Sequence, residues 1–169
     1  MLKFKIKTKD VTSISDEKIL EATEDILKNN ILMSMASLHG VENTPWINTA
    51  YYAYNNQARL FYMSPQDAIH TKNITVDQHV AVSIFDSSQQ PDSHKRGLQM
   101  TGFCQVAHSV DLVAGIKEYG LRYASFAIKS VDDLEKLSSR MYIIKPTLIK
   151  IFHEELLGDE KWVTVEIER

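Results

Sequence analysis

The feature of this sequence that most constrains its fold is a change of hydrophobic period near residue 31. Before it, from Ile19 to Leu27, apolar residues return every three or four positions, which is the spacing of one face of a helix. Ser15 precedes two acidic residues and suits the N-cap of that helix. After residue 31, apolar and polar residues alternate in short segments, as in strands with one buried face. We therefore predict a helix over 16–28 followed by an antiparallel sheet.

Turn residues such as Asn55-Asn56 divide the alternating part of the chain into segments of strand length. Because proline cannot donate to a sheet ladder, we expect a bend or an edge position at Pro146. The predicted strands are 31–38, 46–54, 59–63, 79–85, 97–108, 141–152 and 162–167, and residues 2–6 could add a short edge strand. The further predicted helices are 65–77, 111–126 and 132–139.

These elements predict a mainly β protein with peripheral helices. Six or seven strands with a few helices around them are typical of an antiparallel barrel. The length of 169 residues fits one domain over 1–169. Within it we expect the N-terminal helix at 16–28, a barrel core over 31–108, and helices plus closing strands over 109–169.

Composition and charge exclude several classes of function. The formal net charge is −3, so no global positive field attracts nucleic acid. No apolar run reaches the ~20 residues that span a bilayer, and the N-terminus lacks the apolar region of a secretory signal. The single cysteine, Cys104, cannot form an internal disulfide, so we expect a protein of the reducing cytoplasm. Its place within a predicted strand is typical of a small buried residue. The six histidines lack metal-ligand spacing, and no metal is expected.

Four segments follow one another in a fixed order: PWINTAYYAYN at 45–55, LFYMSP at 60–65, NI with DQHVAV at 73–74 and 77–82, and GLQMTG at 97–102. Together they resemble the pyridoxamine 5′-phosphate oxidase-like family. They are similar to the family's second and third barrel strands, its short helix with the following strand, and the strand after its variable loop. The resemblance covers about residues 16–108 and continues beyond them only in the order of the elements. It implies the split-barrel fold that binds flavin mononucleotide (FMN), a homodimer, and one FMN in each of two sites at the subunit interface.

The resemblance and the chemistry of a flavin together indicate candidate cofactor-binding residues. A flavin phosphate needs cationic groups and hydroxyl or backbone donors near one turn, and a flavin ring needs a flat apolar slot with donors for its polar edge. The candidates are Asn48, Thr49 and Ala50 on the second barrel strand, Tyr62, Met63 and Ser64 on the third, His70, Thr71 and Lys72 after the turn, and Gln99 and Thr101, which would reach the flavin of the partner subunit.

Most of these candidates also have a purely structural interpretation. The alternatives are a helix cap for Ser64, ordinary exposed helix positions for His70 and Lys72, a barrel wall for the strand of Asn48, and a solvent-facing pair for Gln99 and Thr101. The amino-acid sequence is compatible with both cofactor binding and a structural role at these positions.

The sequence departs from the family at the positions of the family's charged residues. Where the oxidase carries Arg and Lys in its second strand, this chain has Asn48 and Ala53. In the flavin-phosphate turn, Ala68-Ile69-His70 replaces a Ser-Arg-Lys run. These differences argue against authentic pyridoxamine phosphate oxidase activity.

The resemblance leads us to expect an FMN-binding flavoprotein that acts as an oxidoreductase on a small-molecule substrate of undefined identity. The flavin ring would carry out the hydride chemistry, and the sequence names no catalytic acid or base. One alternative is a non-enzymatic binding or sensor protein on the same barrel, for flavin, haem or another planar ligand. Another is a structural barrel with an empty cleft.

Overall fold

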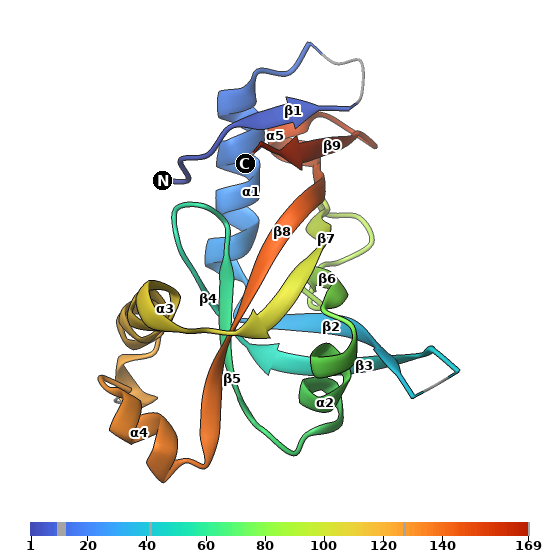
Figure 1. The fold of residues 1–169 in the computed structure, drawn as a ribbon. Coiled ribbons are helices and arrows are strands. Elements are labelled where there is room, and N and C mark those ends of the chain that lie inside the picture. Colours follow the sequence, from blue (N-terminus) through green and yellow to red (C-terminus); the bar gives the residue numbers. More distant parts are fainter. Residues whose placement is uncertain (10–12, 41, 127, 169) are drawn as a thin grey trace.

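The fold is an antiparallel sheet of nine strands, surrounded by helices and not closed into a complete barrel (Figure 1). The computed structural model describes residues 1–9, 13–40, 42–126 and 128–168. The strands are β1 (Ile6–Thr8), β2 (Leu32–His39), β3 (Thr44–Tyr51), β4 (Ala53–Tyr54), β5 (Leu60–Pro65), β6 (His79–Phe85), β7 (Arg96–Val106), β8 (Ser139–His153) and β9 (Trp162–Ile167). The helices are α1 (Asp16–Asn29), α2 (Ile69–Val76), α3 (Ser109–Arg122), α4 (Val131–Lys136) and α5 (Glu154–Leu157), with a 3-10 turn at Ala124–Phe126.

The long strand β8 holds the two halves of the sheet together. Its first half pairs with β5 and its second half with β9, while its other edge pairs with β7. Gly102 of β7 lies opposite Pro146 and Thr101 lies opposite Leu148, so Thr147 is an extra residue on β8. The bend expected at Pro146 is therefore confirmed, as a β-bulge within a continuous strand.

The single strand predicted over 46–54 is wrong, because the chain turns at Tyr52. Before this residue β3 pairs with β2, and after it the short β4 pairs with β5. The backbone N–H of Tyr52 donates to Ile31 O, and its carbonyl accepts from the Tyr123 hydroxyl at 2.6 Å. The N–H bond is the last of the β2–β3 ladder, whereas the carbonyl is bonded outside the sheet by Tyr123, so the pairing with β2 ends at Tyr52. This division, together with β1, gives nine strands in the described residues, where six or seven were expected.

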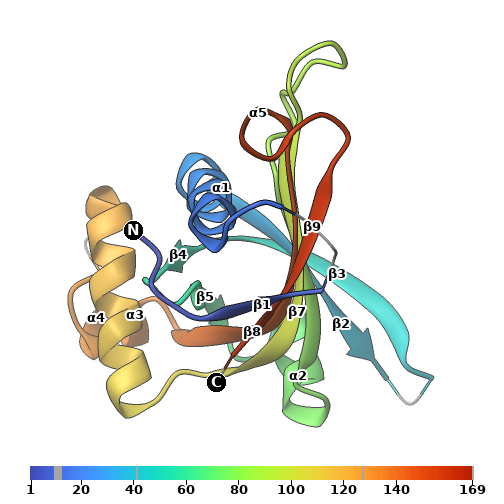
Figure 2. The same ribbon diagram turned by 90° about the horizontal axis from the view of Figure 1, so that it is seen from above.

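The helices cover the sheet on different sides (Figure 2). Helix α1 begins where predicted, and its Ser15 cap accepts from the Lys18 N–H at 3.4 Å. Helices α3 and α4 pack against the β4, β5 and β8 region, whereas α2 packs against β2 and β3. Three predicted boundaries are corrected: α2 begins at Ile69 and not at 65, α3 ends at Arg122 and not at 126, and the N-terminal strand occupies 6–8 and not 2–6.

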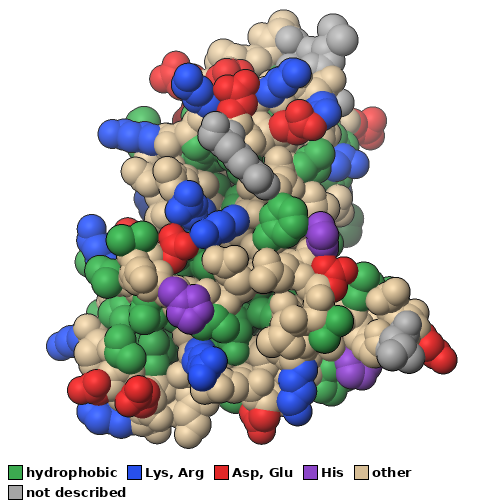
Figure 3. Space-filling model, in the orientation of Figure 1, with side chains coloured by type: hydrophobic (Ala, Val, Ile, Leu, Met, Phe, Trp, Pro, Cys, Tyr) green, Lys and Arg blue, Asp and Glu red, His purple; other side chains and the backbone are tan. Residues whose placement is uncertain are grey.

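Two groups of buried side chains form the interior. The larger group fills the barrel and includes Met35, Tyr62 and Ile144. The smaller group lies beneath α3 and includes Phe61 and Ile143. Charged side chains of both signs are interspersed over the face shown in Figure 3. Among the helices of the described segments, none is long and apolar enough to cross a membrane.

Cys104 lies in the larger core, as its sequence context predicts. Burial raises the pKa of its thiol to about 12, so the thiol stays protonated near neutral pH. Because the thiolate is the reactive form, the native protein should not react with a thiol reagent at pH 8, and the denatured protein should react with one equivalent. A colorimetric disulfide-exchange assay checks this, and rapid labelling of the native protein would contradict it.

Candidate cofactor site

The candidate site, here called the opening, is the region where strands β3 and β5 separate from each other. The two strands diverge from Tyr52, since β3 pairs only with β2, and β4 covers only the first two residues of β5. Within the described part of the chain, the facing edges of β3 and of residues 62–65 therefore lack a strand partner. Helix α2 follows β5 and packs on β2 and β3 beside this opening (Figure 1). Unpaired strand edges offer backbone N–H and C=O groups to a ligand.

Asn48 is the residue of β3 that points into the interior here. It lies opposite Met35, a fully buried residue of β2, and therefore leaves the same face of the sheet. Its side-chain Nδ2 and Oδ1 atoms are both inaccessible to solvent, and neither has a hydrogen-bond partner among the described residues. Leaving a buried polar group unpaired costs about 1–3 kcal/mol. A ligand that offers both an acceptor and a donor would satisfy this amide.

The turn from β5 to α2 uses its hydroxyl groups internally. Ser64 Oγ and His70 Nε2 are 2.8 Å apart, and Thr71 Oγ1 donates toward the carbonyls of the turn, the nearest being Ala68 O at 2.7 Å. Burial lowers the pKa of His70, which favours the neutral imidazole. Ser64 does not cap α2, because the N-cap position is Ala68. This arrangement favours structural roles for Ser64, His70 and Thr71.

Two cations remain available beside this turn. Lys72 is exposed on α2, whose first turn has no side-chain cap. Arg140 of β8 lies directly opposite Ser64, so its side chain leaves the same face as Ser64 and Tyr142. The Tyr142 hydroxyl interacts with Thr71, which places this face toward α2. Sequence reasoning missed Arg140, because only the β5–β8 register brings it to this turn.

A second polar cluster fixes α2 to β2. Asn73 Nδ2 donates to Ser37 Oγ at 2.9 Å, and Asn73 Oδ1 is 2.9 Å from His39 Nδ1. With this orientation of the amide, His39 carries its proton on Nδ1 and leaves Nε2 as an acceptor. The His39 ring lies 5.9 Å from the Trp46 ring, centroid to centroid.

The remaining candidates on β3 and β5 divide between the two faces of the sheet. Ala50 shares the face of Asn48, whereas Thr49 points outward, 3.4 Å from Ser34 Oγ. The Tyr62 side chain is a core residue that stacks on Tyr142 at 5.2 Å. The Met63 side chain packs toward the group beneath α3. Tyr62 and Met63 can therefore offer only their backbones to the opening.

Gln99 and Thr101 lie on the outer face of the sheet, opposite to the face of Asn48. They line a groove of about 380 Å³ whose apolar members include Ala36, Ile47 and Leu148. Ile47 is 68% exposed there. Because the sheet separates the two groups, one chain cannot bring Gln99 and Asn48 to the same ligand.

Comparisons with known proteins identify the fold. Protein-family models and curated proteins give no match to this sequence. A haem-binding protein from Mycobacterium smegmatis has a TM-score of 0.68 and 14% identity, over 92% of this chain and 60% of that chain. A protein of the pyridoxinephosphate oxidase family from Clostridium acetobutylicum, related to general stress protein 26 of B. subtilis, has a TM-score of 0.60 and 11% identity, over 90% and 96%. An F420 reductase has a TM-score of 0.54 and 20% identity, over 75% and 94%.

The fold is therefore that of the pyridoxamine 5′-phosphate oxidase-like split barrels, and the predicted resemblance is confirmed at this level. The sequence is divergent from each of the three proteins. This chain spans only 60% of the length of the mycobacterial protein.

Proposed function

We propose that this protein binds FMN in the opening between β3, β5 and α2 and acts as a flavin-dependent oxidoreductase. The observation that carries the proposal is the buried Asn48 amide, which has neither a donor nor an acceptor partner among the residues that the structure describes. The polar edge of a flavin ring offers both kinds of group, so the residue fits the cofactor. When bound, the flavin would supply the hydride chemistry, while the chain would orient the ring and exclude water from it.

The phosphate of the proposed cofactor would lie at the start of α2. The backbone N–H groups of the first turn have no side-chain cap, and a helix N-terminus favours an anion. Lys72 and Arg140 would add positive charge there. This arrangement would replace the Ser-Arg-Lys run that the sequence lacks.

We further propose a homodimer with the cofactor at the subunit interface. Gln99 and Thr101 face away from the opening of their own chain, so only a second copy could use them at its cofactor. The apolar outer groove around Ile47 supports the same contact, because it is an exposed surface that a second sheet would bury. A small-molecule substrate would then reach the flavin between the two subunits.

The first experiment is a visible absorption spectrum of the purified protein, followed by FMN titration of the wild type and of Asn48→Leu. We expect a two-banded flavin spectrum and saturable binding by the wild type. Asn48→Leu should weaken FMN binding about tenfold, since hydrogen bonds to the ring are lost. The same change should stabilise the apoprotein by about 1 kcal/mol, because an unpaired buried amide is replaced by an apolar group of similar size.

A second variant, Lys72→Ala, removes the cation proposed to bind the phosphate. Its matched control is Lys129→Ala, which removes an exposed cation outside the site. Only Lys72→Ala should weaken FMN binding. Reduction of the bound flavin by NADH or NADPH would distinguish an enzyme from a binding protein. A colourless wild type that does not bind FMN would contradict the proposed function.

Haem binding is the second candidate function, and His39 favours it. A metal-ligating histidine usually donates its other ring N–H to an oxygen, as His39 does to Asn73, and Nε2 is then oriented toward a ligand. If haem is the cofactor, haemin titration should give a Soret band that shifts in His39→Ala. The absorption spectrum therefore separates the two candidates directly.

A further inference from the structure

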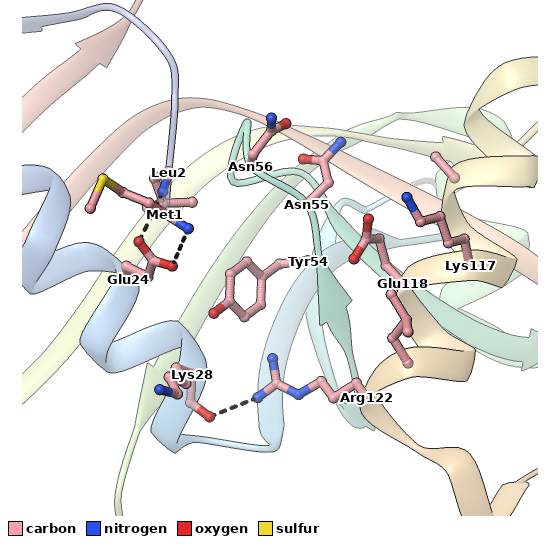
Figure 4. A pocket seen from close by; sticks show the side chains of 12 residues that line it. Met1, Leu2, Glu24, Lys28, Tyr54, Asn55, Asn56, Lys117, Glu118 and Arg122 are labelled. Atoms are coloured by element: carbon pink, nitrogen blue, oxygen red, sulfur yellow. Dashed lines mark hydrogen bonds and ion pairs between the residues drawn. The ribbon is translucent and has the colours of Figure 1, made fainter.

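A cavity separate from the proposed cofactor site lies between α1, the β4–β5 turn and α3 (Figure 4). Its volume of about 700 Å³ is within the range of small-molecule sites. None of the proposed cofactor-binding residues lines it. The inference drawn from this cavity therefore does not rest on the proposed function.

Arg122 forms one end of this cavity, and its guanidinium is fixed in place. Nη2 donates to carbonyls at the end of α1, including Leu27 O at 2.8 Å. The guanidinium carbon lies 4.7 Å from the centroid of the Tyr52 ring and 5.2 Å from that of Tyr54. Nη1, in contrast, is buried and has no hydrogen-bond partner in the described part of the chain. A buried charged donor without an acceptor costs free energy, and a ligand that supplies an acceptor would remove this cost.

Glu118 supplies an unpaired charge of the opposite sign. It precedes Arg122 by one helical turn, a spacing at which an acid and a base normally pair. Here the guanidinium is drawn away to the end of α1, and no hydrogen bond or ion pair to the Glu118 carboxylate exists within the described residues. Figure 4 shows the Tyr54 ring between the carboxylates of Glu24 and Glu118, with Arg122 below it in this view. The cavity thus carries a buried guanidinium nitrogen and a half-buried carboxylate around an aromatic face, and neither is paired within the described residues.

The rest of the lining narrows the chemistry of the ligand. Glu24, Lys28 and Lys117 add charges of both signs, so the cavity as a whole does not select a simple anion or a simple cation. Leu121 adds an apolar surface to the lining, which also includes the Tyr54 ring. A molecule that suits all of these groups has two opposite charges and an apolar part.

We propose that this cavity binds a small zwitterion of the kind that an amino acid presents. Its carboxylate would accept from Arg122 Nη1, and its ammonium group would donate to Glu118. Its apolar side chain would lie against Tyr54 and Leu121. The two charged partners belong to one helix, so the site is formed by α3 against the end of α1.

The test is calorimetric titration of the full chain with L-phenylalanine and with two matched probes that each lack one charge. The probes are 3-phenylpropanoate, without the ammonium group, and 2-phenylethylamine, without the carboxylate. L-phenylalanine should bind saturably, and each probe should bind at least about tenfold more weakly, because one charge-assisted hydrogen bond is lost.

The variant that tests the assignment is Glu118→Gln, since Arg122 also caps α1 and its removal would disturb the fold. Glu118→Gln should weaken L-phenylalanine binding about tenfold, whereas Glu135→Gln on α4 should leave it unchanged. Absence of saturable binding by L-phenylalanine would overturn the proposal. Equal binding of the probes, or unchanged binding by Glu118→Gln, would also overturn it.

Discussion

Replacing Gly102 by alanine should lower the free energy of unfolding by about 3 kcal/mol. A Cβ atom at this position would lie 2.3 Å from Lys145 O and 2.8 Å from Pro146 Cα. Both neighbours are backbone atoms of the β8 bulge, so neither can move aside by a side-chain rotation. The two strands must separate where β8 joins the halves of the sheet. Urea denaturation followed by circular dichroism measures the change, as a lower midpoint at an unchanged slope.

Gly97→Ala is the matched control, because it lies on the same strand. There the nearest atoms to an added Cβ are Phe85 Cβ at 3.1 Å and Ile84 O at 3.3 Å, so a shift of a few tenths of an ångström accommodates it. We expect a loss below about 1 kcal/mol for Gly97→Ala. Equal midpoints for the two variants would show that the bulge at Pro146 is not a close contact.

Replacing Ile47 by arginine should convert the proposed homodimer to a monomer and weaken FMN binding about a hundredfold. The side chain is 68% exposed in the single chain and lies in the outer groove, so an arginine there places an unpaired charge in the proposed interface. FMN affinity should fall in parallel, because the partner's Gln99 and Thr101 would leave the site. The loss of several polar contacts is equivalent to about 2.7 kcal/mol. Light scattering measures the mass, and FMN titration the affinity.

Val113→Arg is the control for this substitution, since Val113 is 70% exposed on α3, which does not contribute to the groove. It should leave both the mass and the FMN affinity unchanged. A wild type that is monomeric, or an Ile47→Arg variant that stays dimeric, would contradict the proposed interface. Loss of the dimer without loss of FMN affinity would separate the two proposals and place Gln99 and Thr101 outside the cofactor site.

Local patterns in the sequence located several elements closely. The strands expected at 79–85 and 162–167 have these bounds in the structure, and the helix expected at 16–28 ends one residue later. Periodicity succeeds here because each of these segments places one face against the core along its whole length. It failed at Tyr52, where the backbone is held by Ile31 and Tyr123, residues that no local pattern connects to it.

The candidate site was harder to predict than the strands. Residues 48–50 and 62–64 do flank one opening, but the side chains of Thr49, Tyr62 and Met63 point elsewhere. Arg140 joins the turn only through the register of β5 with β8. The uncapped start of α2 also depends on where that helix begins, which the polar composition of 65–77 did not define.

The sequence by itself determined the mainly β class, the order of the elements and the family that the fold resembles. Those properties depend on neighbours along the chain, namely the alternation of apolar residues and the residues that form turns. The tertiary structure decided that the Asn48 amide is buried with no partner in the described part of the chain and that Gln99 lies on the opposite face. It also decided that Arg122 binds the end of α1 and does not pair with Glu118. The physical reason is that burial and hydrogen bonding are set by contacts between segments distant in sequence, and a one-residue change of register or a turn such as that at Tyr52 redirects them.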